Sequence, residues 1–102
     1  MSYFAAATMR EAKRMTALRD SYEKQLAELP KGSLRVRERN GNKYCYLAYR
    51  HEGKVISKYV GNSESVVVDL QERLERRKGI ENLLKSIRKE LTLMNKVLEA
   101  TK

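Results

Sequence analysis

An Asn-Gly pair at residues 40–41 separates two runs in which apolar and polar side chains alternate. Asn-Gly is typical of the two-residue type I′ turn of a β-hairpin, because both central residues of that turn need a positive φ. The turn fixes which residues face each other, and a shift of one residue would exchange the two faces of the hairpin. With Asn-Gly at the centre, Arg35 lies opposite Tyr46. The sequence therefore predicts a hairpin of residues 34–39 and 43–50 with a defined register.

A second turn, at Glu52-Gly53, leads to a third predicted strand at residues 54–60. A two-residue loop at this turn places Tyr46 opposite Tyr59, and Cys45 opposite Val60. The three strands then have two faces of different character. The apolar face, which we expect to form the core, carries Leu34, Val36, Cys45, Leu47, Tyr49 and Ile56. The opposite face carries Arg35, Arg37, Tyr44, Tyr46, Ala48 and Tyr59.

Both flanks of the predicted sheet have the three-to-four-residue periodicity of amphipathic helices. The first helix is predicted at residues 6–29, and Pro30 ends it. The second helical segment covers residues 64–100, and Gly79 interrupts its apolar stripe, so it is either one kinked helix or two joined helices. We therefore expect an α+β fold of one domain, residues 1–102. A three-stranded antiparallel sheet lies between an N-terminal helix and a long C-terminal helical segment.

A heptad-like seam of apolar residues runs along the end of the second helical segment. Its members are Leu84, Ile87, Leu91, Met94 and Leu98. An unbroken helix over this segment would be about 55 Å long, which is too long for a compact domain of this size. The seam therefore needs a partner, either the first helix or a second copy of the chain. We expect it to be a homodimer interface, because the first helix offers only about three and a half turns of apolar stripe.

The net charge of +9 is concentrated in the middle of the chain. Residues 31–62 hold eight basic and two acidic residues, whereas the segments before and after them have balances of +1 and +2. A localised positive field of this kind attracts polyanions, of which nucleic acid is the commonest. Charge that served only solubility would not need this segregation. Residues 73–78 form a second basic cluster, but neighbouring glutamates balance it, and we interpret it as a solvated helix face.

The arginine-tyrosine face of the predicted sheet suits a polyanion. Arginine binds phosphate or the edge of guanine, and tyrosine offers a ring that stacks on a base. A sheet can also enter a major groove. The alternatives are cross-strand packing on a solvated surface and an interface with another protein. The predicted nucleic-acid-binding residues are Arg35, Arg37, Arg39, Lys43, Tyr44, Tyr46, Arg50 and Tyr59.

The sequence favours a binding protein over an enzyme. Cys45 is the only cysteine and His51 the only histidine, which argues against a disulfide and a Cys/His metal site. No phosphate-binding glycine loop, serine elbow or paired carboxylates are present. No apolar run approaches the roughly 20 residues of a membrane span, and residues 1–7 are too few for the core of a signal peptide. We therefore expect a cytoplasmic, non-enzymatic protein with no metal, cofactor or membrane association.

Six short motifs in the middle of the chain form a signature. They are Pro30-Lys-Gly-Ser-Leu34, Asn40-Gly41, Lys43-Tyr-Cys-Tyr46, Tyr49-Arg50, Gly53-Lys54 and Lys58-Tyr-Val-Gly61. Over about residues 29–61 the chain thereby resembles a set of small, mostly uncharacterised bacterial and mobile-element proteins, which combine a helix, this sheet signature and a charged helical tail. Cys45 departs from the pattern, which has a tyrosine or another large residue at that position. The sheet is also similar in outline to the arm-binding domain of tyrosine integrases, which reads a major groove.

The resemblance implies a mobile-element, phage or toxin-associated setting, because some of those proteins accompany nucleotidyltransferase-type toxin modules or transposable elements. We expect the chain to bind nucleic acid, with DNA favoured, and to catalyse no reaction. The alternative is a protein-interaction module, such as an antitoxin or an inhibitor that binds a nucleic-acid-processing enzyme. Copurification of nucleic acid or of a protein partner would separate the two.

Overall fold

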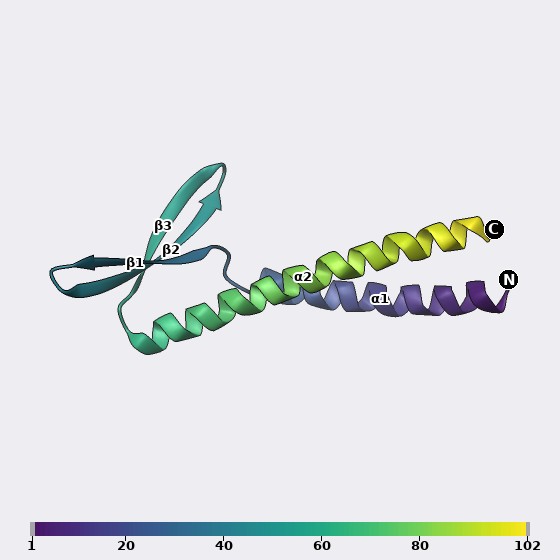
Figure 1. The fold of residues 1–102 in the computed structure, drawn as a ribbon, viewed down its shortest axis with the longest axis horizontal. Helices are drawn as coiled ribbons and strands as arrows, with labels where there is room; N and C mark the ends of the chain where they lie inside the picture. Colours follow the sequence, from purple (N-terminus) through teal and green to yellow (C-terminus); the bar gives the residue numbers. More distant parts are fainter. Residues whose placement is uncertain (1, 102) are drawn as a thin grey trace. The chain divides into compact units, whose positions relative to one another are not determined.

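The computed structural model describes residues 2–101 of the chain. Its elements, in order, are α1 (Tyr3–Ala27), β1 (Ser33–Arg39), β2 (Asn42–His51), β3 (Lys54–Gly61) and α2 (Glu64–Ala100). The three strands form one antiparallel sheet in the order β1-β2-β3 (Figure 1). The predicted α+β fold is therefore confirmed. The chain divides into two compact units, one made of α1 with the part of α2 from Gly79, and the other of Leu29–Lys78.

The α1 helix begins at Tyr3 rather than at residue 6. Ser2 is its N-cap, with an extended backbone and an Oγ that accepts a hydrogen bond of 3.1 Å from the amide of Ala5. This bond satisfies one of the free amides of the first turn. The helix ends at Ala27, before the predicted end, and the Glu28 amide donates a bond of 3.2 Å to the carbonyl of Gln25. The helix thus starts earlier than its apolar stripe, because a capping side chain and not periodicity sets the first turn.

The first hairpin has the predicted register, with Arg35 opposite Tyr46. Asn40 and Gly41 have φ values of 52° and 78°, as the type I′ turn requires. The second hairpin likewise pairs Tyr46 with Tyr59.

The pairing of Cys45 with Val60 was wrong. The register shifts between Cys45 and Tyr46, so that Cys45 lies opposite Gly61 and Val60 is the extra residue. A β-bulge places two residues of one strand opposite one residue of its neighbour, and a register counted from the turn does not reveal it.

The apolar face of the sheet is covered unevenly. Cys45, on the central strand, is buried, and Leu47 beside it is half-buried. Val36 was expected in the core, but 56% of its surface is exposed. It lies on the edge strand β1, which has a neighbour on one side only. The half-buried residues that complete this face are Leu34, Tyr49 and Ile56.

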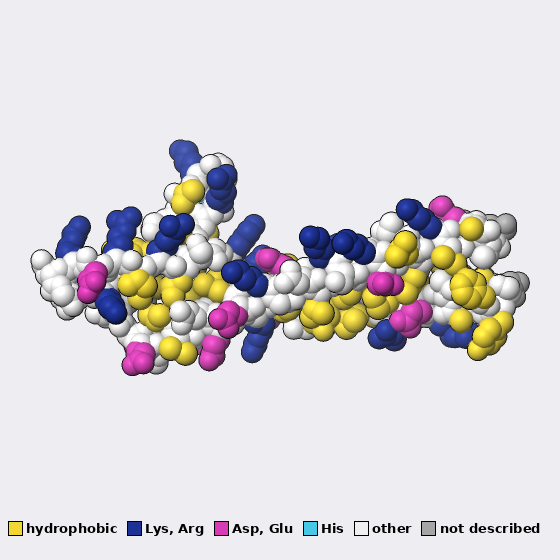
Figure 2. Space-filling view, viewed as in Figure 1, with side chains coloured by type: hydrophobic (Ala, Val, Ile, Leu, Met, Phe, Trp, Pro, Cys, Tyr) yellow, Lys and Arg dark blue, Asp and Glu magenta, His cyan; other side chains and the backbone are white. Residues whose placement is uncertain are grey.

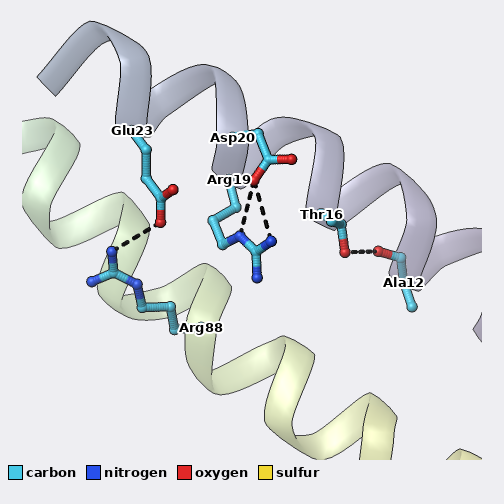
Figure 3. Close-up of polar contacts among 6 residues, drawn as sticks. All are labelled: Ala12, Thr16, Arg19, Asp20, Glu23 and Arg88. Carbon is cyan, nitrogen blue, oxygen red and sulfur yellow. Dashed lines mark hydrogen bonds and ion pairs between the residues drawn. The ribbon is translucent and has the colours of Figure 1, made fainter. Parts of the chain in front are cut away.

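The α1 helix and the end of α2 form an antiparallel pair within one unit (Figure 1). Glu23 of α1 accepts a hydrogen bond of 3.2 Å from Arg88 of α2 (Figure 3). Between the helices the buried residues are Ala5, Ile80, Leu84, Ile87 and Leu91. Exposed ion pairs add little, so the apolar contacts supply most of the stability of the pair.

The seam has a partner within the chain, which is the first of the two alternatives that the sequence left open. Leu84, Ile87 and Leu91 are buried within a single chain, and Met94 and Leu98 are half-buried. The α1 helix, which has 25 residues, lies beside the seam from the contact of Glu23 with Arg88 to the hollow that Phe4 and Val97 line. The α2 helix is also a single helix of 37 residues that continues through Gly79.

Candidate nucleic-acid interface

The predicted arginine-tyrosine surface is present on one side of the sheet. Alternate residues of a strand point to the same face, and the register places side chains from all three strands together. Tyr46 is central, because it lies opposite Arg35 of β1 on one side and Tyr59 of β3 on the other. We name this surface the basic-aromatic face and define it by Arg35, Arg37, Arg39, Tyr44, Tyr46 and Tyr59.

The ring of Tyr59 contacts two other tyrosine rings of the basic-aromatic face. The ring centroids of Tyr46 and Tyr59 are 5.4 Å apart, with an interplanar angle of 58°. Those of Tyr44 and Tyr59 are 6.2 Å apart, at 49°. Tilted pairs at these distances are favourable because the edge of one ring meets the face of the other. The cluster therefore holds Tyr59 in place, although 51% of its surface is exposed.

Arg37 lies over one of these rings. Its guanidinium carbon is 5.6 Å from the centroid of the Tyr46 ring, within the range of a cation-π contact. The contact orients Arg37 on the surface and covers part of the Tyr46 ring. Tyr59 consequently offers the more accessible ring of the two.

Two hollows lie on the surface of the sheet. One, of about 540 Å³, is lined by Arg37, Glu38, Arg39, Tyr44 and Tyr46. Glu38 was not among the predicted site residues, because strict alternation places it on the opposite face of the strand. Its position between Arg37 and Arg39 was the only sequence feature that pointed to it. The second hollow, of about 440 Å³, is lined by Arg35, Val36, Arg37, Ala48, Val55 and Ser57.

The arginines of the basic-aromatic face have no acidic partners within the part of the chain that the structure describes. The side chains of Arg35 and Arg39 make no hydrogen bond or ion pair there, and Arg37 contacts only the Tyr46 ring. The other predicted cations, Lys43 and Arg50, are exposed on β2 and also unpaired among residues 2–101.

Four arginines of the helices are paired with carboxylates. Arg14 bonds to Glu11, Arg19 to Asp20, Arg73 to Asp69 and Arg88 to Glu23. The guanidinium of Arg14 holds the pKa of the Glu11 carboxyl below its ordinary value, chiefly through their hydrogen bond. The close-up in Figure 3 shows the Arg19–Asp20 and Arg88–Glu23 contacts. The arginines of β1 therefore differ from these four helical arginines, whose charge is neutralised by a neighbouring carboxylate.

The second basic cluster contains a structural residue. Arg77 is half-buried, and its Nη1 donates a hydrogen bond of 3.0 Å to the carbonyl of Leu29. The interpretation of this cluster as a solvated face is therefore corrected for Arg77, which ties α2 to the segment that precedes β1. Arg76 and Lys78 are exposed.

The two residues considered for metal or nucleophilic chemistry lie apart from the basic-aromatic face. Cys45 is buried on the apolar face, and His51 is exposed at the end of β2, with Nε2 3.9 Å from the carboxylate of Glu52. Within residues 2–101, no three His, Cys, Asp or Glu side chains gather in a group that could hold a metal ion. Among the same residues, none of the helices combines the length and apolarity that crossing a membrane requires.

Comparison with known families gives one match, over residues 10–69, to a domain of unknown function, DUF6788. The match covers more than half of the chain. The chain belongs to the DUF6788 family. In this DUF6788 protein the matched segment contains all three strands, and thus the whole basic-aromatic face. No curated protein and no solved structure matches the chain.

Proposed function

We propose that the chain binds nucleic acid through the basic-aromatic face and catalyses no reaction there. The observation that carries the proposal is the set of arginines that have no acidic partner among the described residues and stand beside a tyrosine cluster in which Tyr59 is exposed. Unpaired guanidinium groups keep their full charge for phosphates, and each phosphate that they neutralise releases counterions.

The spacing of the arginines supports this proposal. Arg35, Arg37 and Arg39 occupy alternate positions of β1, so their Cα atoms repeat about every 6.8 Å along the strand. That repeat is comparable with the separation of successive phosphates along one nucleic-acid strand. Because β1 is an edge strand, its outer side has no neighbouring strand in the sheet. We infer that these three residues contact the backbone of the nucleic acid.

The tyrosines have different roles in this proposal. Tyr59 has the accessible ring and is the residue that stacks on a base or packs against a sugar. Tyr46 positions Arg37 through the cation-π contact, and Tyr44 supports the ring of Tyr59. The resemblance of residues 29–61 to mobile-element proteins favours DNA as the polyanion, in a mobile-element, phage or toxin-associated system.

A salt titration of binding to duplex and single-stranded oligonucleotides tests the proposal. We expect the slope of log affinity against log salt to become less steep by about two units in the Arg35→Ala/Arg37→Ala variant, because each lost phosphate contact removes about one unit. Tyr59→Ala should weaken binding by about 1–3 kcal/mol and leave the slope unchanged, since stacking is not a charge effect.

The matched control removes the same charge from a helix. Arg76→Ala/Lys78→Ala changes two exposed cations and leaves the structural Arg77 intact. If this variant lost as much affinity as the sheet variant, only diffuse charge would be involved and the assigned face would be wrong. If the wild-type protein bound no oligonucleotide at low salt, the proposal would fail, and the protein-interaction alternative would take its place.

A further inference from the structure

Glu38 is an acidic side chain in the most basic part of the chain. Residues 31–62 hold only two acidic residues, and Figure 2 shows Lys and Arg side chains gathered over the strands. Glu38 lies between Arg37 and Arg39 in β1 and opposite Lys43 of β2. It is exposed, and within residues 2–101 its carboxylate makes no hydrogen bond or ion pair with these cations. The carboxylate is therefore available as a hydrogen-bond acceptor for a ligand.

The hollow that Glu38 lines also has an aromatic wall. Its volume of about 540 Å³ is within the usual range for small-molecule sites, and its other lining residues are Arg37, Arg39, Tyr44 and Tyr46. Because Arg37 lies over the ring of Tyr46, Tyr44 offers the ring against which a ligand can pack in this hollow. The Tyr44 ring is 6.2 Å from that of Tyr59, so the hollow adjoins the ring that we assign to base stacking. It therefore combines a ring for stacking with a carboxylate that accepts hydrogen bonds.

The second hollow of the sheet differs in its chemistry. The described residues that line it include Arg35 and Arg37, but none of them is acidic or aromatic. A phosphate suits that hollow, whereas a phosphate close to Glu38 would be repelled by the carboxylate. The hollow of Glu38 consequently suits an uncharged, planar group with N–H donors. The base of a nucleotide is such a group.

The four bases of DNA differ in the donors that they present to such a carboxylate. On its Watson–Crick edge guanine carries two adjacent donors, a ring N–H and an amino group. Adenine and cytosine carry an amino group beside a ring nitrogen that accepts, and thymine carries one ring N–H between two carbonyl groups. The two oxygens of a carboxylate can accept two parallel N–H bonds, and charge-assisted bonds of this kind are stronger than neutral ones. An unpaired carboxylate therefore favours guanine, provided that the edge of the base is not occupied by base pairing.

We propose that the hollow lined by Glu38 binds an unpaired guanine base of single-stranded nucleic acid. Both donors of the Watson–Crick edge bond to the Glu38 carboxylate, and the face of the base packs against Tyr44. Proteins that read single strands commonly combine hydrogen bonds to this edge with stacking on aromatic side chains. The inference rests on the proposed function, in which the arginines of β1 hold the backbone. It adds a preference for one base and for a single strand, since a duplex keeps this edge in its base pairs.

Fluorescence anisotropy with short oligothymidines tests this assignment. Each oligonucleotide carries one central guanine, adenine, cytosine or thymine, so that all four have the same charge. We expect the full chain to bind the guanine oligonucleotide at least about fivefold more tightly than the other three, because a bidentate contact supplies about that much discrimination. Glu38→Gln should remove this preference, since its amide presents a donor to the two donors of guanine. It should not weaken binding to the thymine oligonucleotide, because it removes a negative charge from a surface that binds phosphates.

Glu52→Gln is the matched control. It makes the same change of charge at an exposed residue of the turn between β2 and β3, outside the hollow, and should leave the guanine preference unchanged. A guanine preference that survived in Glu38→Gln would overturn the role of Glu38. Equal binding of the four oligonucleotides by the wild-type protein, or binding of duplex and of none of the four, would overturn this inference and leave the proposed function standing. If the chain bound neither duplex nor single strands at low salt, the proposed function would fail together with the inference.

Discussion

Gly32 shows how a single backbone position controls entry into the sheet. It has a φ of +128°, and a Cβ built on it would lie 2.3 Å from the carbonyl oxygen of Ala48. Ala48 pairs with Ser33, so the close approach occurs where β1 begins. Only glycine fits this position, because both the dihedral angle and the space exclude a side chain.

We expect Gly32→Ala to lower the free energy of unfolding by more than about 2 kcal/mol, since a left-handed φ alone costs an L-residue about 1–2 kcal/mol. Urea denaturation measures the effect. Gly41→Ala is the control: it also has a positive φ, but its Cβ would meet no atom within 4 Å, so its loss should be smaller. If the two variants lost the same free energy of unfolding, the close approach of residue 32 to the carbonyl of Ala48 would not be what excludes a side chain there.

Leu84 and Leu83 are neighbours on α2 with opposite environments. Leu84 is 1% exposed and Leu83 is 47% exposed. Leu84→Ala should therefore cost about 2–5 kcal/mol, because it removes buried contacts and leaves a cavity, whereas Leu83→Ala should stay within about 0.5 kcal/mol of the wild type. Thermal or urea unfolding of the two variants would show the difference. Similar losses would place the buried face of α2 elsewhere.

At the scale of the elements, turn chemistry made the sheet predictable. Asn40-Gly41 fixed the first hairpin, and every pair counted from that turn is present. The bulge at Val60 was missed because we placed Gly61 in the turn that closes the sheet, whereas it lies in β3 opposite Cys45 with a φ of 111°. Val36 has the alternation of a core residue, but its exposure depends on the strand order and not on its own sequence.

The helices show a different limit. A heptad seam predicts that apolar residues need a partner, but it does not identify that partner. That partner is α1, whose C-terminal half lies beside this part of α2, as the contact of Glu23 with Arg88 shows. For the candidate site, the composition of the basic-aromatic face followed from the register. The contact of Arg37 with the Tyr46 ring depends on side-chain rotamers, which periodicity does not specify.

The structure of α2 does not require a glycine at position 79. It is helical and exposed, and a Cβ there would meet no atom within 4 Å. We expect Gly79→Ala to raise the free energy of unfolding by about 1 kcal/mol, which is the difference in helix propensity between the two residues. A higher melting temperature with an unchanged circular dichroism spectrum would agree with this prediction. A loss of stability would show that α2 needs to bend at this position.

At the scale of the whole molecule, the two compact units carry different properties. Leu29–Lys78 contains the sheet, its unpaired arginines and the proposed nucleic-acid interface. The helical pair contains most of the buried apolar residues in the described part of the chain. The α2 helix is the one element that belongs to both units. Its residues up to Lys78 belong to the unit of the sheet, and its residues from Gly79 belong to the helical pair.

The division into two units predicts that a substitution in one unit destabilises mainly that unit. Leu84→Ala should speed hydrogen exchange in α1 and in residues 79–100, with little change in the strands, because the contacts that it removes lie within the helical pair. Gly32→Ala should do the reverse, since its clash is with β2. Native-state exchange of the two variants, each compared with the wild type, gives both patterns in one experiment. If each substitution instead accelerated exchange throughout residues 3–100 by the same factor, the α2 helix would couple the two units into the single cooperative domain that the sequence predicts.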